Sequence, residues 1–475
     1  MSEASARKKI TAATRIPNYE RLALHSRYSS KLITNPELTR ALVSFQANKN
    51  SPFYRWLKYK EAFSSDFVKY ILQKFPTIAN SPPRVLDPFA GVGTTLTIAV
   101  RMGCKAIGIE LLPVGTTAIR ARLIAEKVNL KSFEYYLKKL EELPFDTHRS
   151  NGYQFPHLRI TKNAFPKQTE KAFSAYSAFL EEIDRDDVRS LFFFAWLSIL
   201  EEVSYTRKDG QYLRWDFRSN RRLESKFNKG TIPDLRSSIL NKLYLMHEDI
   251  KRRKKRIDFR KMKIIDGSCL TELPKLPDAS IDLIITSPPY CNRYDYTRTY
   301  ALELAFLGYT DDGIKKLRQT LLSATVENKT KRKQLAEEYN SMNRMNHYNS
   351  ALNTFYNQKA LQEILNLLNT AREKRRLNNN NIPNMVENYF FEMNLVIQEL
   401  GRILAPNGHV IMVNDNVQYY GEEIPVDLIL SDFATSAGLS VEMIWVLQKG
   451  KGNSSQQMGN HGRNELRKCT YIWSK

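Results

Sequence analysis

Two prolines between a serine and a tyrosine close an apolar stretch in the middle of the chain. Residues 281–285 read as a short buried strand, which Thr286, Ser287, Pro288, Pro289 and Tyr290 close. Because proline lacks a backbone N–H and fixes φ, the pair ends the sheet ladder and leaves a stiff turn with free carbonyls. A hydroxyl, a carbonyl and an aromatic ring could together hold a planar group that carries an NH₂. The alternative is a strand-ending turn with a core tyrosine.

A glycine-containing turn further upstream has the spacing of a nucleotide-binding βαβ unit. Residues 84–95 read as a strand, a glycine turn with Gly91 and Gly93, and the start of a helix. Glu110 ends the next apolar strand about 20 residues after the glycines, where an acid reaches a ribose diol in such units. Leu96 stands where the dinucleotide motif has its third glycine, which favours an adenosyl ligand without phosphate.

Together the two motifs resemble those of the amino-group DNA methyltransferases. Asp87–Thr94 is similar to the motif with which that family binds S-adenosylmethionine (AdoMet), and Ser287–Tyr290 is similar to its catalytic motif. Within the family a leading serine is more typical of cytosine N4 enzymes, and a leading aspartate or asparagine of adenine N6 enzymes. The resemblance implies a Rossmann-like class I α/β fold with helical insertions, AdoMet as cofactor and double-stranded DNA as substrate. It also implies a restriction–modification system, in which a cognate endonuclease acts on the same site.

The resemblance extends to further segments and assigns roles to individual residues. Trp56–Ser64 resembles the segment that packs over the methionine end of AdoMet, Asp266 the acid at its adenine, and Glu110 the acid at its ribose. The implied reaction is methyl transfer to the exocyclic amine of a flipped base. The implied catalytic residues are Ser287, Pro288, Pro289 and Tyr290, and the implied cofactor-binding residues are Lys60, Ala62, Phe63, Asp87, Pro88, Phe89, Ala90, Gly91, Gly93, Thr94, Thr95, Glu110 and Asp266.

Composition agrees with a polyanionic partner. The chain has 72 Lys and Arg against 50 Asp and Glu, a formal charge of +22, and a pI near 9.6. Its four cysteines show no metal-binding spacing, so they are expected to be reduced, mostly buried thiols, and no metal site is predicted. No segment has the apolar length of a membrane span, and the first residues do not read as a secretory signal. A cytoplasmic location is expected.

The spacing of the motifs predicts a catalytic domain in three parts, interrupted by two insertions. Residues 171–180 and 188–203 are predicted helices, and the apolar run in the second favours a core helix over a cofactor site. Either insertion could recognise the target. The predicted segments are an N-terminal extension (1–49), catalytic parts (50–125, 259–309 and 387–475), a first insertion for target recognition (126–258) and a helical second insertion, interrupted near 378–381, that would clamp or recognise DNA (310–386).

Arginines interleaved with aromatic residues mark the end of the first insertion as a candidate for DNA contacts. Such side chains suit phosphate contacts, base edges and stacking, although a solvated basic surface would have the same composition. The candidates are Arg207, Lys208, Arg214, Arg218, Arg221, Arg222 and, after the catalytic motif, Arg293.

Two other functions stay open at this level. An RNA methyltransferase that modifies an exocyclic amine can use a similar Pro-Pro-aromatic turn, although no appended RNA-binding module is evident in the sequence. A degenerate methyltransferase fold could also serve as a non-catalytic subunit that reads nucleic acid. Intact cofactor and catalytic motifs speak against this last alternative.

Overall fold

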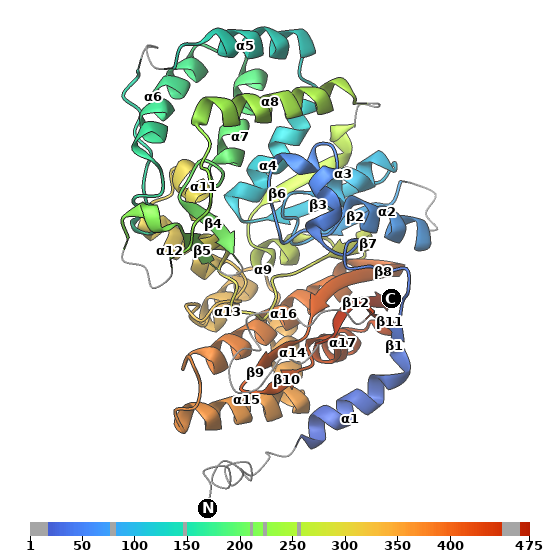
Figure 1. Cartoon of the computed structure of the whole chain (residues 1–475). Helices are drawn as coiled ribbons and strands as arrows, with labels where there is room; N and C mark the ends of the chain where they lie inside the picture. Colours follow the sequence, from blue (N-terminus) through green and yellow to red (C-terminus); the bar gives the residue numbers. More distant parts are fainter. Residues whose placement is uncertain are drawn as a thin grey trace, which may run out of the picture.

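A computed structural model of the chain (Figure 1) describes residues 18–76, 82–145, 150–209, 212–221, 226–253, 258–448 and 466–475. At the centre of this described part lies an eight-stranded sheet. From one edge to the other its strands are β1 (Leu32–Thr34), β11 (Ser440–Val446), β12 (Lys468–Ser474), β8 (Leu404–Asp415), β7 (Ile281–Thr286), β2 (Arg84–Asp87), β3 (Lys105–Glu110) and β6 (Met262–Asp266).

The strand order places a switch point between β2 and β7. Strands β8, β7, β2, β3 and β6 run parallel, whereas β12 runs antiparallel to both of its neighbours. The chain leaves β2 toward β3 on one side, and returns much later to β7 on the other. In open α/β sheets ligands bind at the carboxyl ends of the strands at such a point. This topology confirms the predicted α/β class with a Rossmann-like sheet and helical insertions.

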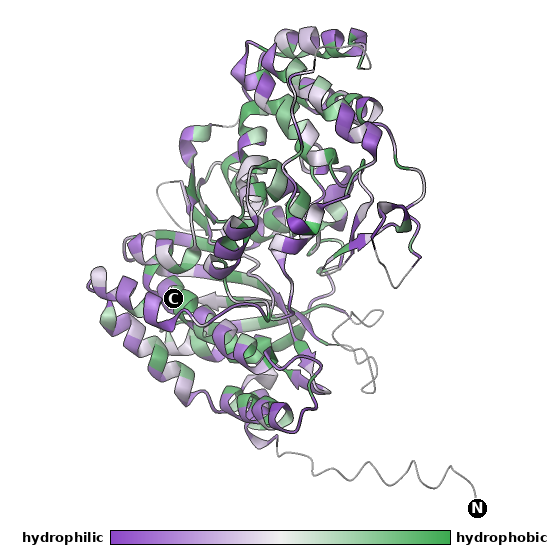
Figure 2. Cartoon of the chain, turned by 90° about the vertical axis from the view of Figure 1, so that its left-hand side faces the viewer, coloured by the Kyte–Doolittle hydropathy of each residue, from purple (hydrophilic) through white to green (hydrophobic). Residues whose placement is uncertain are grey.

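Helices cover both faces of the sheet, and the alternation of residues along β7 shows how. Leu283 and Ile285 pack with α2 (Ser65–Lys74) and α3 (Thr94–Arg101), whereas Ile284 points into the opposite core. That second core is built on α16 (Ile382–Ile403) and α17 (Val426–Ser436). Because both faces are buried, the strand reads as a nearly continuous apolar run. Figure 2 shows hydrophobic residues concentrated in the central strands and hydrophilic ones along the peripheral helices.

The first insertion forms a helical unit with a hydrophobic core of its own, at the top of Figure 1. Both predicted helices are confirmed, and Phe192 and Trp196 of the apolar run are buried in this core, as expected. The unit ends in a short antiparallel hairpin, β4 (Thr206–Asp209) with β5 (Tyr212–Trp215). Its helices are α5 (Leu130–Glu142), α6 (Lys167–Glu181), α7 (Asp186–Ile199) and α8 (Leu235–Lys251), and α7 packs on α4 (Pro113–Ala125), which precedes the insertion.

Residues 332–373 of the second insertion and residues 19–34 of the N-terminal extension lie at the opposite end of the molecule. The interruption of the helices expected near residues 378–381 is confirmed, because α15 (Lys359–Glu373) ends before it and α16 begins after it. From residue 18 onward the extension is part of the fold, since α1 (Tyr19–Tyr28) packs on α15 and β1 pairs with β11. The remaining helices are α9 (Cys269–Glu272), α10 (Tyr296–Thr299), α11 (Ala301–Phe306), α12 (Asp311–Thr320), α13 (Arg332–Ser341) and α14 (Met345–Asn357), and β9 (Val417–Tyr419) pairs with β10 (Glu422–Ile424).

The structure also bears on membrane-spanning helices and on the state of the cysteines. No helix in the described ranges combines the length and apolar character needed to cross a membrane. The four cysteines are free thiols buried in the protein, as the sequence predicted.

Candidate active site

A pocket of about 770 Å³, partly open to solvent, lies at the carboxyl ends of the strands around the switch point. Every one of the four strands β2, β3, β6 and β7 contributes residues directly after its last position, which is where the topology predicts a ligand. These residues are Pro88, Phe89 and Gly91 after β2, Glu110 to Leu112 at the end of β3, Gly267 to Cys269 after β6, and Ser287 and Pro289 after β7. The pocket therefore brings together both sequence motifs, which lie about 200 residues apart in the chain.

The Asp87 carboxylate holds the glycine turn in place. Its carboxylate accepts hydrogen bonds from the Thr286 hydroxyl (2.7 Å), the Phe89 backbone N–H (3.1 Å) and the Thr95 hydroxyl (2.7 Å). Burial raises the pKa of this carboxyl to about 6, against the lowering effect of these donors. Since both oxygens are engaged, Asp87 ties β2, β7 and α3 together and lies beneath the pocket wall.

Glu110 presents a buried carboxylate to the same turn. It accepts hydrogen bonds from the Gly91 N–H (2.5 Å) and the Leu112 N–H (2.6 Å), and burial raises its pKa to about 8. The backbone is close here, because a Cβ added at Gly115 would lie 2.5 Å from the Gly91 carbonyl oxygen. Gly91 itself has φ of +53°, a conformation that favours glycine. The turn and the acid thus form one rigid wall of the pocket.

Several residues of the predicted cofactor set lie away from the pocket. Asp266 forms an ion pair with Arg120 at the surface, so a contact with a ligand would require its carboxylate to leave that arginine. Lys60 directs its ammonium to the Lys208 carbonyl oxygen (2.6 Å). The others are buried in cores or partly buried against them: Ala62, Phe63, Ala90, Gly93, Thr94 and Thr95.

The turn after β7 separates two hollows. Ser287 and Pro289 line the strand-end pocket, whereas Tyr290 lines a second hollow of about 610 Å³, which we call the Tyr290 hollow. The Ser287 hydroxyl donates to the Tyr290 oxygen over 3.3 Å. The floor of the Tyr290 hollow includes Asp415, whose carboxylate pairs with Lys468 at 2.7 Å. Pro288 between them is buried.

A carboxylate and a set of tyrosines complete the strand-end pocket, and the sequence-based reasoning missed them. Glu61 lines the pocket and accepts hydrogen bonds from the hydroxyls of Tyr294 and Tyr300. Tyr59 stacks on Tyr300 with ring centroids 5.1 Å apart. Tyr59 and Glu61 belong to the same segment as Lys60 and Ala62, but only they face the pocket. The run of tyrosines directly after the catalytic motif was the available signal.

The second insertion also reaches this pocket. Residues at the end of α12 and in the loop after it form the wall opposite the strands, so this part of the insertion is not a free-standing arm. The lining residues are Arg318, Leu321, Leu322, Ala324, Thr325 and Asn328. Sequence spacing gave no indication of this contact, because it depends on how the insertion folds back.

Comparison with known proteins decides the family. No family model matches the chain. Type II methyltransferase M.AvaI of Nostoc sp. is 44% identical over 463 residues, which cover 95% of this chain and 92% of that protein. Type II methyltransferase M.BsoBI of Geobacillus stearothermophilus is 39% identical over 476 residues, covering 97% and 92%. The chain belongs to the type II methyltransferases.

Because the matches span nearly the whole chain, both insertions are shared with these relatives. A more distant type II methyltransferase, M.MvaI of Kocuria varians, is 21% identical over 387 residues and covers 78% of this chain. Within the described residues of this methyltransferase, no group of three or more His, Cys, Asp or Glu side chains is placed to hold a metal ion.

Among the predicted nucleic-acid-binding residues of this methyltransferase, one has an exposed side chain and several contact other residues of the protein. Arg207 is exposed on β4. Lys208 is not at the surface: it forms an ion pair with Glu303 at 2.5 Å, with both side chains 2% exposed, which does not fit the predicted DNA contact. The other described candidates have protein partners: Arg214 pairs with Asp209, Arg218 pairs with Asp216, Arg221 bonds to the carbonyls of residues 159, 160 and 162, and Arg293 donates to Asn378. Arg222 lies outside the described residues.

Proposed function

We propose that this chain is an AdoMet-dependent DNA methyltransferase that methylates the exocyclic amino group of a flipped base, with cytosine N4 as the preferred target. The observation that carries the proposal is the position of Ser287–Tyr290 between two hollows. A methyl donor held in one hollow and a base held in the other would meet at this turn. The similarity to type II methyltransferases supports the same function.

The strand-end pocket has the chemistry that AdoMet requires. The Glu110 carboxylate at the end of β3 suits a ribose diol, and Gly91 presents bare backbone to the pocket, which allows a ligand to approach closely. Glu61 adds a second carboxylate among tyrosine rings, which suits a cationic ligand with an ammonium group. When bound, AdoMet would supply a methyl group on a positively charged sulfur.

The residues of the turn would prepare the amine for attack. The base must first leave the helical stack, at a cost of a few kcal/mol, to reach the Tyr290 hollow, where the tyrosine ring can stack on it. The amine would then donate its two hydrogens to the Ser287 hydroxyl and the Pro288 carbonyl. These bonds favour a pyramidal nitrogen with a free lone pair, so positioning and electrostatics supply most of the help. The proton of the cationic product passes to solvent.

The serine in the motif favours cytosine N4, and adenine N6 is the alternative within the same mechanism. Mass spectrometry of nucleosides from duplex DNA, incubated with the protein and isotopically labelled AdoMet, tests both. Labelled N4-methylcytosine is the expected result, and N6-methyladenine would change the target base. Label in structured RNA but not in DNA would overturn the proposal and support an RNA methyltransferase. A protein that binds AdoMet but labels neither would be a non-catalytic subunit.

A substitution at the turn separates chemistry from cofactor binding. Ser287→Ala removes one acceptor for the amine, so we expect the single-turnover rate of methyl transfer to fall by about tenfold or more, the worth of one good hydrogen bond. AdoMet affinity, measured by calorimetry, should change little. Ser280→Ala, at the opposite end of β7, is the matched control. Full activity in the Ser287 variant would contradict the proposed geometry.

The family association further leads us to propose a restriction–modification system with a cognate endonuclease that cuts the same double-stranded site. Digestion of DNA methylated by this protein, compared with unmethylated DNA, would identify such an enzyme as the one that methylation blocks.

A further inference from the structure

A basic groove lies between the N-terminal segment and the end of the first insertion. It consists of two adjoining hollows of about 1160 Å³ and 790 Å³, which share Phe45, Lys49, Lys58 and Arg207 in their walls. One wall is formed by residues 44–60 and the other by residues 198–209, with contributions from Lys229 and Lys242. The segment before residue 50 therefore faces the insertion across a continuous depression.

The groove carries a strong excess of positive charge. Its walls contain eight basic side chains against three acidic ones. The basic residues are Lys49, Arg55, Lys58, Lys60, Arg207, Lys208, Lys229 and Lys242, and the acidic ones are Glu201, Glu202 and Asp209. Two of the basic residues are neutralised from outside the groove, since Lys208 pairs with Glu303 and Arg55 with Asp249, which leaves six basic side chains against the three acids. Such a line of charge fits an extended polyanion better than a single small anion, because the cations are distributed along the walls.

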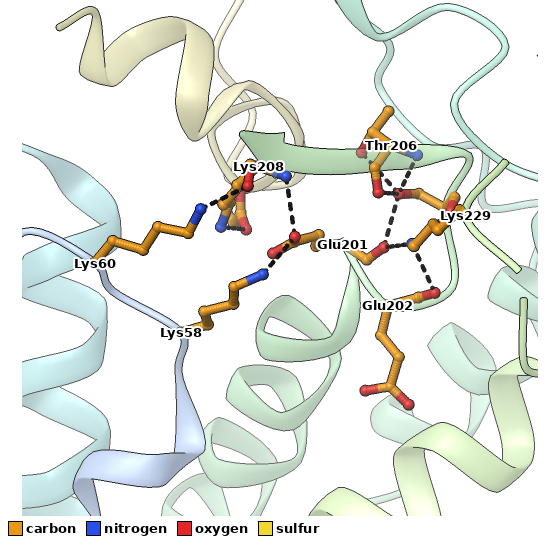
Figure 3. A network of polar contacts seen from close by, with 9 residues as sticks. Lys58, Lys60, Glu201, Glu202, Thr206, Lys208 and Lys229 are labelled. Carbon is orange, nitrogen blue, oxygen red and sulfur yellow. Dashed lines mark hydrogen bonds and ion pairs between the residues drawn. The ribbon is translucent and has the colours of Figure 1, made fainter. Parts of the chain in front are cut away.

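Several of these ammonium groups contact backbone carbonyls, which do not neutralise their charge. Lys60 donates to the Lys208 carbonyl (2.6 Å), Lys242 to the Trp56 carbonyl (2.9 Å), and Lys229 to the carbonyls of Glu202 (3.0 Å) and Ser204 (2.7 Å). Figure 3 shows Lys60 and Lys229 in these contacts, while Lys58 reaches the Glu201 carboxylate. Burial lowers the pKa of Lys60 and Lys242, and that of Lys229 to about 8. An incoming phosphate would relieve this cost by supplying a counter-charge.

The wall from the N-terminal segment is held firmly in place. Asp249 of α8 accepts hydrogen bonds from the Phe53 N–H (2.8 Å) and the Trp56 indole N–H (2.8 Å), and pairs with Arg55 at 2.5 Å. The Asn48 side chain bonds to the Phe63 carbonyl at 2.9 Å. A preorganised wall loses little conformational entropy when it binds a ligand.

The groove is continuous with the hollow beside the catalytic turn. Ser44 and Gln46 line both the basic groove and the Tyr290 hollow. A strand lying along the groove would therefore pass directly over the place where a flipped base would enter.

We propose that the basic groove holds the sugar–phosphate backbone of duplex DNA beside the nucleotide that enters the Tyr290 hollow. The inference rests on the proposed function, and it adds a DNA-binding role for the N-terminal segment. Lys49 and Arg207, one on each wall, would contact phosphates directly. Both side chains are exposed, and in the part of the chain that the structure describes neither side chain forms a hydrogen bond or ion pair with another residue.

The test is the salt dependence of DNA binding by a Lys49→Gln/Arg207→Gln double variant. Fluorescence anisotropy with a labelled 30-base-pair duplex of mixed sequence gives Kd across a range of salt concentrations. Loss of two phosphate contacts should reduce the slope of log Kd against log salt by about 2, and weaken binding about tenfold or more at low salt. Lys49→Arg/Arg207→Lys keeps the charges and should keep the slope.

Two further comparisons make the outcome decisive. Lys131→Gln/Lys138→Gln makes the same charge change on exposed residues of α5, which lines neither hollow, and should leave the slope unchanged. A groove variant with the wild-type slope, or with the slope of this control, would overturn the proposal. A loss of affinity for structured RNA but not for duplex DNA would also overturn it.

The proposed function is tested separately, by label transfer from AdoMet to DNA with the wild-type protein. If the wild type methylates DNA and the groove variant binds normally, only the groove assignment fails. If the slope changes as expected but no label reaches DNA, the groove assignment stands and the methylation proposal fails.

Discussion

Glu110 is the residue whose ionisation is most sensitive to a ligand in the strand-end pocket. Burial raises its pKa to about 8, so in the free protein at pH 7 the carboxyl is mostly protonated. Hydroxyl groups of a ribose would donate to the ionised form and stabilise it. Ligand binding should therefore lower the pKa and release a proton.

This coupling predicts that nucleoside affinity rises as the pH is raised from about 7 to above 8, because the free protein then no longer loses a proton on binding. Methylthioadenosine is the suitable probe, since it has the ribose of AdoMet but neither its ammonium nor its sulfonium. Calorimetry in buffers of different ionisation enthalpy should show proton release at pH 7. Glu110→Gln should abolish both the proton release and the pH dependence. A pH dependence that persists in this variant would assign the ionisation to another group.

At the scale of elements, a buried carboxylate on α16 holds the loop that closes the pocket. Glu392 accepts hydrogen bonds from the Ser323 N–H and the Ser323 hydroxyl, both at 2.7 Å, and pairs with Lys331 at 2.9 Å. Lys331 in turn donates to the Leu321 carbonyl at 2.9 Å. Leu321 lines the strand-end pocket, so α16 positions a wall of this pocket from outside it.

The loss of one charge from this buried pair should cost more than the loss of both. Glu392→Gln leaves the Lys331 ammonium buried without a counter-charge, and we expect a loss of about 3–5 kcal/mol in the free energy of unfolding. Lys331→Met in the same protein should recover a large part of that loss. Urea denaturation of the two single variants and the double variant measures the coupling between the two side chains. Calorimetry with methylthioadenosine measures whether the substitutions also change the ligand affinity of the strand-end pocket. Additive losses would show that the two side chains are not coupled.

At the scale of the whole molecule, the sequence predicted the elements that recur around the sheet but not the way in which distant segments meet. The motif strands, the turn at Gly91 and the helices of the first insertion follow from local patterns, so they could be predicted. The pocket contacts of Glu61 and Arg318 depend on long-range folding, and the spacing of residues carries no signal for them. The burial of Lys208 against Glu303 could not be predicted, because its basic, aromatic sequence surroundings look the same whether or not a carboxylate lies opposite.

The two ends of the chain differ in how much they contribute to the stability of the sheet. β12 pairs on both sides, with β11 and β8, and carries the fully buried Tyr471 and Trp473. β1 pairs only with β11 at the sheet edge, and the adjoining α1 contributes Leu24 and Tyr28 to the core. Removal of an internal strand leaves two unpaired strands and a cavity, whereas removal of an edge element leaves one exposed strand.

We therefore expect deletion of residues 466–475 to abolish folding, because the sheet would separate between β11 and β8. Deletion of residues 1–36 should give a folded protein whose Tm is lower by roughly 5–10 °C, since only a few buried side chains are lost. The exposed β11 edge should also promote self-association, which size-exclusion chromatography detects. Circular dichroism and thermal unfolding compare the two proteins directly. A soluble, cooperatively unfolding protein without residues 466–475 would show that the sheet does not depend on β12 to join its two halves.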